Sequence, residues 1–292
     1  MKDTTKKWLF LIILSVIWGS SFILIKKSLL GLTPYQLGAL RTIITGFILF
    51  SVGWKSLKSI KKEEWKWIVI SGCLGSFLPA FLFAVAETEI DSAITSILNS
   101  LVPLNAILIG FSIFKIGFTR RQLLGVITGF IGTSILIFKG SDLNPDQNYL
   151  YAGFVIMATI MYAFNVNIIK KYLQQVKPLS IATGNYIAIM LPAIVILFAT
   201  DFFSETTYSN PDFKMAMLYV CILSLFGTAL AKVLFNTLVQ LSTPVFASSV
   251  TYLMPVVALG WGLLDGESFG LLQLVASIII LLGVFLAHKK TT

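Results

Sequence analysis

The stretch Ser15-Val16-Ile17-Trp18-Gly19-Ser20-Ser21 lies inside an apolar segment that ends at Lys26-Lys27. A second stretch, Thr159-Ile160-Met161-Tyr162-Ala163-Phe164-Asn165, lies inside another apolar segment that ends at Lys170-Lys171. The two stretches are 144 residues apart, and the same spacing pairs Pro34 with Pro178 and Arg41 with Asn185. An aromatic residue, a polar residue and a lysine pair recur in the same order, which indicates an internal repeat.

The repeat continues beyond this first match at slightly different spacings. At 152 residues the pairs are Gly75 with Gly227, Phe83 with Phe235, and Ser96, Asn99, Ser100 and Pro103 with Ser248, Thr251, Tyr252 and Pro255. At 151 residues, Gln122 meets Gln273 and Gly132 meets Gly283. The longer segment 200–213 absorbs the shift from the first spacing. We therefore expect two similar units, residues 1–140 and 149–288.

The composition requires lipid as the solvent for most of the chain. Hydrophobic residues make up 57% of the 292 residues, charged residues make up 12%, and the mean hydropathy is +0.88. A soluble protein cannot cover so much apolar surface with so few charges. A helix of about 20 apolar residues crosses a bilayer. Ten such segments are predicted, at 8–25, 34–53, 67–86, 92–114, 121–138, 150–169, 179–199, 214–236, 244–264 and 270–287.

Each of the two units would contain five spans, and an odd number has a topological consequence. The second unit must enter the membrane from the side opposite to the first, so the repeats are inverted. The predicted fold is an all-α integral membrane protein with ten transmembrane helices in two inverted five-helix repeats. Inverted repeats around a central pathway are typical of transporters rather than of receptors or enzymes.

Lysine and arginine gather in alternate loops. If both termini lie in the cytoplasm, sixteen of the 22 fall on the cytoplasmic side, four fall on the other side, and Arg41 and Lys232 lie within spans. Because short cytoplasmic loops carry an excess of these residues, the distribution predicts cytoplasmic termini. The net charge of +9 then suits the anionic inner leaflet, and no nucleic-acid partner is expected.

Polar residues and prolines share one face of the fourth predicted span and of the ninth. Asn99 lies four residues before Pro103, and Tyr252 lies three residues before Pro255. Each proline removes a backbone donor and leaves a carbonyl free about one turn earlier. Irregular backbone at membrane depth is tolerated where it lines a cavity. Two interpretations stay open, because small polar residues also hold neighbouring helices together by hydrogen bonds.

Aromatic and polar residues are paired at equivalent positions of the first and sixth spans. Trp18 lies three residues before Ser21, and Tyr162 lies three residues before Asn165. Inside a polar cavity, such an aromatic ring stacks on a flat substrate or closes a gate. Core packing and an interfacial aromatic belt are the alternatives. Trp18 lies ten residues into its span, which is too deep for a belt.

Two cations and two amides complete the set of candidate site residues. Arg41 has a planar guanidinium that suits a carboxylate or phosphate, but it could equally cap helix carbonyls or extend outward. Asn185 occupies the equivalent position in the second repeat. Lys232 lies about seven residues from a cytoplasmic loop, so it could line the pathway or extend toward that loop. Asn236 shares its helix face, one turn further on.

Other chemistries find no support in the sequence. The only histidine is His288 in the tail, and Cys73 and Cys221 lie in apolar runs, so neither a metal site nor a disulfide framework is expected. No phosphate-binding loop or catalytic triad occurs, and no cofactor is expected. The carboxylates nearest to the membrane lie in loops rather than in the middle of spans, namely Glu87, Glu89, Asp91, Asp265 and Glu267. This favours facilitated exchange, although coupling through a rim carboxylate such as Glu267 stays open.

The motif Trp18-Gly19-Ser20-Ser21-Phe22, followed by Pro34 and Arg41, resembles the opening of the EamA-type drug/metabolite transporters. The segment 244–267, with Tyr252-Leu253-Met254-Pro255 and Gly266-Glu267, resembles the end of their second repeat. The resemblance implies ten helices, a central cavity and export of metabolites such as amino acids. One departure is Gly117-Phe118, where that family often has Gly-Glu, so a role for a symmetric pair of glutamates is not supported.

We therefore expect an alternating-access exporter of small amphipathic metabolites, with amino acids as the favoured class. The alternatives are an exchanger of phosphorylated sugars or nucleotide-sugars, and a membrane-embedded enzyme or sensor. We expect a monomer in a bacterial inner membrane, whose partners are a small-molecule substrate and the lipid bilayer. The expected substrate-binding residues are Trp18, Ser21, Arg41, Asn99, Pro103, Tyr162, Asn165, Asn185, Lys232, Asn236, Tyr252 and Pro255.

Overall fold

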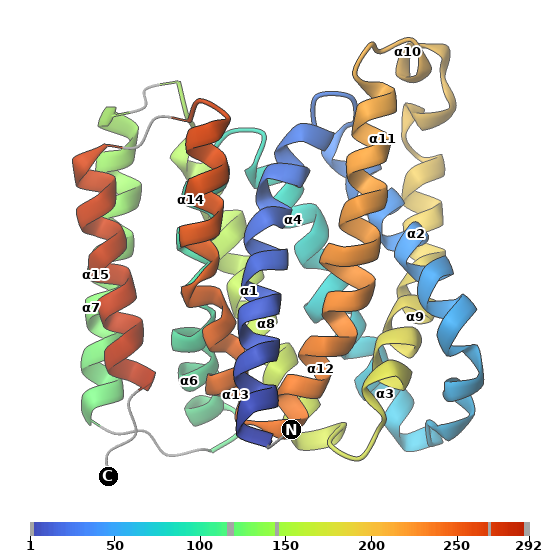
Figure 1. Ribbon diagram of the computed structural model, residues 1–292, viewed down its shortest axis with the longest axis horizontal. Coiled ribbons are helices and arrows are strands. Elements are labelled where there is room, and N and C mark those ends of the chain that lie inside the picture. The colour runs from blue at the N-terminus through green and yellow to red at the C-terminus, as the bar shows by residue number, and fades with distance from the viewer. Residues whose placement is uncertain (1–2, 116–119, 144–145, 268–269, 289–292) are drawn as a thin grey trace.

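The structure is a computed structural model, and it describes residues 3–115, 120–143, 146–267 and 270–288 (Figure 1). Every regular element in these ranges is helical. The helices of the first half are α1 Asp3–Ser28, α2 Pro34–Gly53, α3 Lys62–Gly72, α4 Leu78–Ala86, α5 Ser92–Asn99, α6 Val102–Ser112 and α7 Arg120–Leu143. Those of the second half are α8 Ala152–Tyr172, α9 Pro178–Phe198, α10 Glu205–Tyr208, α11 Phe213–Ile222, α12 Ala231–Leu241, α13 Pro244–Ser248, α14 Met254–Leu264 and α15 Leu271–His288.

Short helical segments of other kinds join or interrupt these α-helices. The 3₁₀ segments are η1 Trp54–Ser59, η3 Tyr149–Tyr151, η4 Asp201–Phe203 and η6 Ser249–Tyr252. The π-helical segments are η2 Cys73–Phe77 and η5 Leu223–Leu230. η2 joins α3 to α4 and η5 joins α11 to α12, so each π segment lies inside one continuous membrane-length helix.

Eight helical stretches among the described residues are long and apolar enough to cross a membrane. They coincide with eight of the ten expected spans, and run over Thr5–Ser28, Pro34–Ser59, Lys62–Ala86, Ser92–Ser112, Tyr149–Tyr172, Pro178–Phe198, Phe213–Leu241 and Pro244–Leu264. The other two expected spans, 121–138 and 270–287, coincide with α7 and α15. Their apolar stretches are shorter, at Leu123–Ile135 and Leu271–Gly283.

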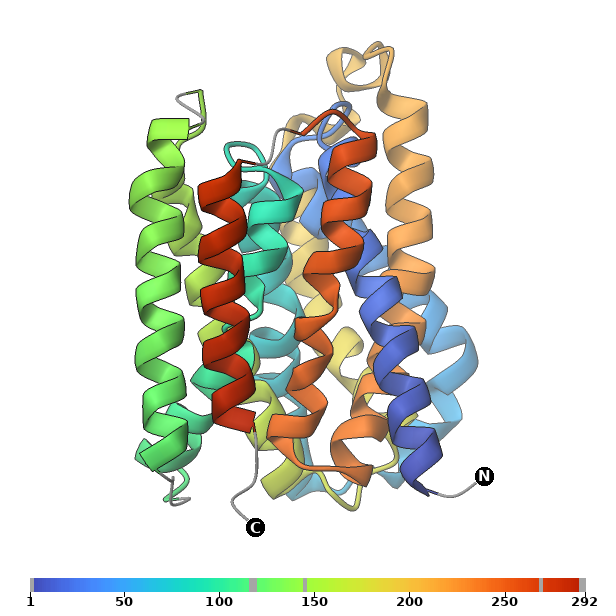
Figure 2. The ribbon, with the colours of Figure 1, turned by 60° about the vertical axis from the view of Figure 1, so that its left-hand side comes forward.

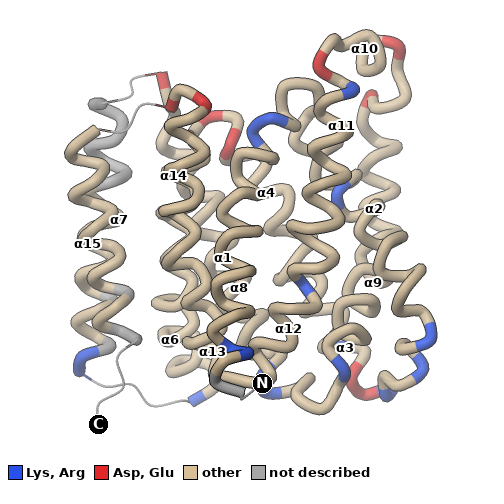
Figure 3. The backbone as a smooth tube through the Cα atoms, viewed as in Figure 1, with Lys and Arg blue, Asp and Glu red and all other residues tan. Residues whose placement is uncertain are grey.

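Both ends of the described chain lie on the same face of the bundle (Figure 1; Figure 2). Figure 3 shows most lysines and arginines on that face, and most carboxylates on the opposite face. The expected departure at Gly117-Phe118 lies outside the described residues.

The fourth and ninth spans are both broken where their prolines predict. α5 ends at Asn99, and α6 resumes at Val102 with Pro103 in its first turn. In the second repeat, α13 passes into η6, and α14 resumes at Met254 with Pro255 in its first turn. A proline cannot donate to the preceding turn, whereas its missing donor costs nothing at a helix start, so each break falls just before it.

α7 and α15 pack against each other at one end of the bundle (Figure 1; Figure 2). Glycines make this packing close. A Cβ atom on Gly283 would overlap the backbone of Gly129, and one on Gly132 would lie 2.8 Å from the backbone nitrogen of Ile280. Small residues let helix backbones approach in lipid, where van der Waals contact rather than the hydrophobic effect holds helices together.

A central cavity as the candidate substrate site

A cavity lies between the two halves of the bundle. It contains about 930 Å³ of space not filled by atoms, open solvent included. Its lining comes from both repeats, through α1, α2, η2 and α5 of the first half and α8, α9, η5 and α12 of the second. Seven of the expected site residues line it, namely Trp18, Ser21, Arg41, Asn99, Tyr162, Asn165 and Lys232.

Two aromatic pairs stand in the cavity wall, and they are equivalent under the repeat. Trp18 packs against Phe235 with ring centroids 5.1 Å apart, and Tyr162 packs against Phe83 at 5.9 Å. Each pair joins the first helix of one half to the third span of the other. The sequence repeats with spacings of 144 and 152 residues therefore correspond to one pseudo-symmetry of the structure. The repeat pairs Phe83 with Phe235 in the sequence, but neither is among the expected site residues. Their equivalent positions in the two halves were the signal that could have identified them.

The two π segments meet the same two helices. A Cβ atom on Gly75 of η2 would overlap the Asn165 side chain, and one on Gly227 of η5 would lie 2.7 Å from Ser21 Oγ. Asn165 and Ser21 are themselves repeat equivalents. Glycine leaves room at both places for a polar side chain from the opposite half, which would have to shift if a Cβ were present. The sequence does not predict the π segments, since no residue pattern specifies an extra residue in a helical turn.

Carbonyl groups of these π segments bind side chains from the cavity wall. Trp18 Nε1 donates to the Gly227 carbonyl oxygen at 2.9 Å. Lys232 Nζ donates to the Gly75 carbonyl oxygen at 2.8 Å. π segments weaken the regular hydrogen-bond ladder and are frequent at functional sites. They here fix the indole and the ammonium group at the cavity.

Arg41 and Lys232 place two cations at the same cavity. Arg41 Nε donates to Thr228 Oγ1 at 2.9 Å, so the rest of its guanidinium is oriented by η5. Lys232 is 5% exposed and points into the bundle, so the alternative in which it extends toward a loop is wrong. None of the described residues that line the cavity is acidic. The site is therefore positively charged, which favours an anionic group on its ligand.

Asn99 and Asn165 supply the cavity with amides. The Asn99 Nδ2 atom lies 3.9 Å from the Met254 sulfur, and its buried Oδ1 atom has no hydrogen-bond partner among the described residues. Asn165 Oδ1 accepts from Ser71 Oγ at 2.7 Å, which orients its amide from α3. An unsatisfied buried acceptor is costly unless a ligand or water completes it. Asn99 Oδ1 is thus the best-placed acceptor for a donor on the substrate.

Five expected residues do not belong to the lining of this cavity. Pro103 and Pro255 begin α6 and α14 and are buried. Asn236 is fully buried and donates to the Pro178 carbonyl oxygen at 3.3 Å. When the side-chain oxygen and nitrogen of Asn185 are exchanged so that both have partners, its amide nitrogen donates to the carbonyl oxygens of Ile68 and Ile181 at 2.9 and 3.0 Å. Tyr252 packs against the hydrophobic core. A binding role for these five residues remains a prediction.

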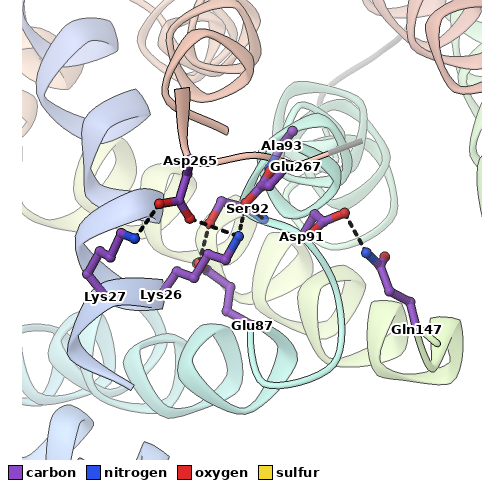
Figure 4. A network of polar contacts seen from close by, with 9 residues as sticks. All are labelled: Lys26, Lys27, Glu87, Asp91, Ser92, Ala93, Gln147, Asp265 and Glu267. Atoms are coloured by element: carbon purple, nitrogen blue, oxygen red, sulfur yellow. Dashed lines mark hydrogen bonds and ion pairs between the residues drawn. The ribbon is translucent and has the colours of Figure 1, made fainter. Parts of the chain in front are cut away.

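Ion pairs join the two halves on the face away from the termini (Figure 4). Lys26 of α1 contacts Glu267 at 2.8 Å and Asp265 at 3.1 Å, and Lys27 also contacts Asp265. Glu267 accepts from the backbone amides of Ser92 and Ala93, each at 3.2 Å, and so caps α5 of the first half. We call Lys26, Lys27, Asp265 and Glu267 the inter-repeat clamp. Every ion pair between described residues belongs to it.

A positive-φ glycine shapes the acidic part of the clamp. Gly266, with φ of 85°, ends α14 in the left-handed conformation that glycine adopts most easily. This turn brings Asp265 and Glu267 onto the same cation, Lys26. Burial alone would raise the pKa of Asp265, but the hydrogen bonds and charges of Lys27 and Lys26 together lower it.

Comparisons with known proteins agree with this architecture. The model of the EamA-like transporter family matches residues 6–138 and again residues 150–288. A crystal structure of a protein has the same fold, with a TM-score of 0.67 and 15% identity over 97% of this chain and 96% of the other. At that identity the similarity concerns the fold alone.

Three relatives resemble the chain over nearly its whole length. An uncharacterized transporter of Archaeoglobus fulgidus is 23% identical, over 98% of this chain and 99% of the relative. The uncharacterized inner membrane transporter YedA of Escherichia coli K12 is 25% identical, over 94% and 87%. An S-adenosylmethionine/S-adenosylhomocysteine transporter of Chlamydia muridarum is 24% identical, over 93% and 89%.

These matches establish what kind of protein this is. The family model covers almost the entire chain in two copies, and relatives that align over 87% or more of their own length are named as transporters. The chain is therefore not an enzyme. With eight helices able to cross a bilayer among its described residues, it belongs to the EamA-like transporter family and is a multi-pass transporter of the bacterial inner membrane.

Proposed function

We propose that this protein exports small amphipathic metabolites by alternating access, with amino acids as the favoured substrates. The observation that supports this best is the chemistry of the central cavity. Two cations, an unsatisfied amide oxygen and an aromatic wall lie together between the two repeats. A zwitterion with an apolar or flat side chain matches all three features.

The proposed binding mode assigns one group of the substrate to each part of the cavity. Arg41 and Lys232 attract the carboxylate, and Asn99 Oδ1 accepts from the ammonium group. The rings of Trp18 and Tyr162 contact the side chain of the substrate. The carboxylate replaces part of the hydration that both cations lose inside the protein, so it binds best where both cations face it.

The proposal includes the topology on which export depends. We propose ten spans, with α7 and α15 as the fifth and tenth, in two repeats at residues 1–140 and 149–288. The lysine-rich face that carries both termini is assigned to the cytoplasm. One chain contains a complete cavity lined by both repeats, so a monomer is sufficient for transport.

A second candidate substrate class is phosphorylated sugars or nucleotide-sugars. The observation in its favour is that both Arg41 and Lys232 line the cavity while none of its described lining residues is acidic.

The Chlamydia relative is named for substrates that combine an amino acid group with a flat adenine ring. A ligand of that shape also suits an aromatic wall beside two cations, and it extends the amino acid proposal to adenosyl compounds.

Counterflow in proteoliposomes tests the proposal directly. Purified protein is reconstituted, the vesicles are loaded with one unlabelled compound from a panel, and uptake of its labelled form is followed. Saturable exchange of particular amino acids is expected. Exchange of phosphate esters alone would replace the first candidate by the second. Monodisperse protein that exchanges no member of either panel would contradict the proposed substrate classes.

A further inference from the structure

Glu87 is a buried carboxyl group beside the inter-repeat clamp (Figure 4). It ends α4, on the face away from the termini, and only 6% of it is exposed. Its Oε2 atom accepts from Ser92 Oγ at 3.0 Å, whereas its Oε1 atom is buried without a hydrogen-bond partner among the described residues. The sequence places Glu87 in a loop next to a span, and the structure adds that its side chain is buried there.

The charges that act on Glu87 come from three elements. Lys26 of α1 and Arg41 of α2 are the cations, and Glu267 after α14 is the other carboxylate. Lys26 is already bound to Glu267 and Asp265. Burial raises the pKa of Glu87 well above its usual range; the Ser92 hydrogen bond opposes this, Glu267 reinforces it, and both cations oppose it. The closed arrangement therefore favours the neutral carboxylic acid.

Glu87 is linked to the clamp through the first turn of α5. Ser92 donates its hydroxyl to Glu87, and its backbone amide donates to Glu267. One residue thus binds the buried carboxyl of the first half and the clamp carboxylate of the second. When Glu267 leaves α5, water reaches Ser92 and the Glu87 side chain beside it. Hydration then restores the ordinary acidity of Glu87.

We propose that Glu87 is a proton-binding site, protonated while the inter-repeat clamp is closed and deprotonated when the clamp opens. Opening of this face then releases one proton from the Glu87 carboxyl to water, and closure takes one up. The inference rests on the proposed alternating access, because it requires this face to open. It adds a coupling ion, the proton, to a transporter whose spans carry no central carboxylate.

The sign of the pH dependence follows from this assignment. Glu87 binds its proton more tightly in the closed state than in the open state, so low pH favours closure. As the pH rises from the ordinary glutamate value toward the raised value, the closed state loses stability relative to the open state. For one linked proton, the ratio of closed to open molecules changes by up to about tenfold per pH unit in that range.

Hydrogen exchange of the α5 amides measures clamp closure without a substrate. The amides of Ser92 and Ala93 are protected when they donate to Glu267. Their exchange is followed by mass spectrometry from pH 5 to pH 8 in the wild type, in Glu87→Gln and in Glu89→Gln. Glu89 lies in the same loop and is the matched control. Comparison of variants at each pH cancels the intrinsic pH dependence of exchange.

The wild type and Glu89→Gln should lose protection by about tenfold or more as the pH rises. Glu87→Gln, a permanent mimic of the neutral acid, should stay protected at every pH. Loss of protection in Glu87→Gln with the same pH profile would overturn the proposal, as would a wild-type profile that is flat. Infrared spectroscopy of the wild type gives a second measurement, since a protonated buried carboxyl has a distinct carbonyl band that should disappear as the clamp opens.

This result is separable from a failure of the proposed substrate class. A pH-dependent clamp without amino acid exchange would retain the proton site and reject the substrate. Exchange of amino acids with a pH-independent clamp would do the reverse.

Discussion

Asn99 and Trp18 are the residues on which the proposed binding mode depends most. Replacing Asn99 with alanine removes the only acceptor assigned to the ammonium group. A hydrogen bond to a charged group contributes about 1.5–3 kcal/mol, so KM in the counterflow assay should rise by about tenfold or more. Trp18→Ala should also reduce exchange, because it removes the ring that packs on Phe235. Both variants should insert in the membrane normally.

Matched controls for these two variants lie outside the cavity. Trp261 of α14 is 44% exposed, and Asn210 lies in the loop before α11. Trp261→Ala and Asn210→Ala should exchange substrate as the wild type does. Full activity of both Trp18→Ala and Asn99→Ala would move the substrate site elsewhere.

Lys232 provides a second test at the residue scale. Lys232→Met keeps the length of the side chain but removes its charge, so the cavity retains one cation for the anionic group. Exchange should fall by at least about tenfold. The substitution should raise KM more than it lowers the yield of purified protein. Lys214→Met, an exposed lysine of α11, is the control. An unchanged KM in Lys232→Met would assign Lys232 to structural support of the Gly75 carbonyl alone.

At the scale of elements, α7 and α15 depend on glycine for their contact. A Cβ on Gly283 meets the Gly129 backbone, which cannot move away as a flexible side chain can. Gly283→Ala should therefore lower the melting temperature of the purified protein by several degrees, since overpacking costs about 1–3 kcal/mol. Gly260 of α14 has open space around its Cβ position, so Gly260→Ala should leave the melting temperature equal or higher.

A melting temperature that stays unchanged in Gly283→Ala would show that the two helices separate without loss of stability. That outcome would remove glycine packing as the reason for the shared position of Gly132 and Gly283 in the repeat.

The elements differ in how far the sequence predicts them. The breaks in the fourth and ninth spans follow from Pro103 and Pro255, because proline lacks the donor that a continuous helix needs. The π segments around Gly75 and Gly227 were not predicted. Their glycines were matched across the repeat, but only the structure shows that each one faces a polar residue of the opposite half.

At the scale of the whole molecule, the two halves are symmetric in the cavity and asymmetric at its ends. Lys26 of α1 and Lys170 of α8 are repeat equivalents. Lys26 binds carboxylates of the opposite half, whereas Lys170 donates to backbone carbonyls of its own half, with Ser242 at 2.7 Å. The ionic closure of the face away from the termini therefore has no counterpart among the described residues of the other face. A pH-sensitive switch on one face only is the expected consequence.

Membrane orientation is a testable property at this scale. A fluorescent protein that matures only in the cytoplasm should be bright when fused to the C-terminus. Alkaline phosphatase, which is active only outside the cytoplasm, should be inactive there and active when inserted at Thr206 of α10. The reverse pattern would invert the proposed orientation. The inter-repeat clamp would then lie on the cytoplasmic face, and the assignment of export would have to change.

The sequence by itself determined the all-helical membrane fold, the repeat and most of the spans. Lipid imposes these features locally, since each span must be apolar over its own length and must satisfy its own backbone. It also indicated seven of the residues that line the cavity, because the cost of polar groups in lipid marks them one by one. Their common location was settled by the way the helices pack.

Only the tertiary structure decided which way the charged side chains face. Lys232 extends to Gly75, 157 residues away along the chain, instead of to its nearest loop. Glu87 follows the end of α4, yet only 6% of it is exposed, and the charges that act on it come from Lys26, Arg41 and Glu267. Such long-range contacts depend on how helices from opposite halves pack, and local hydropathy does not encode that packing.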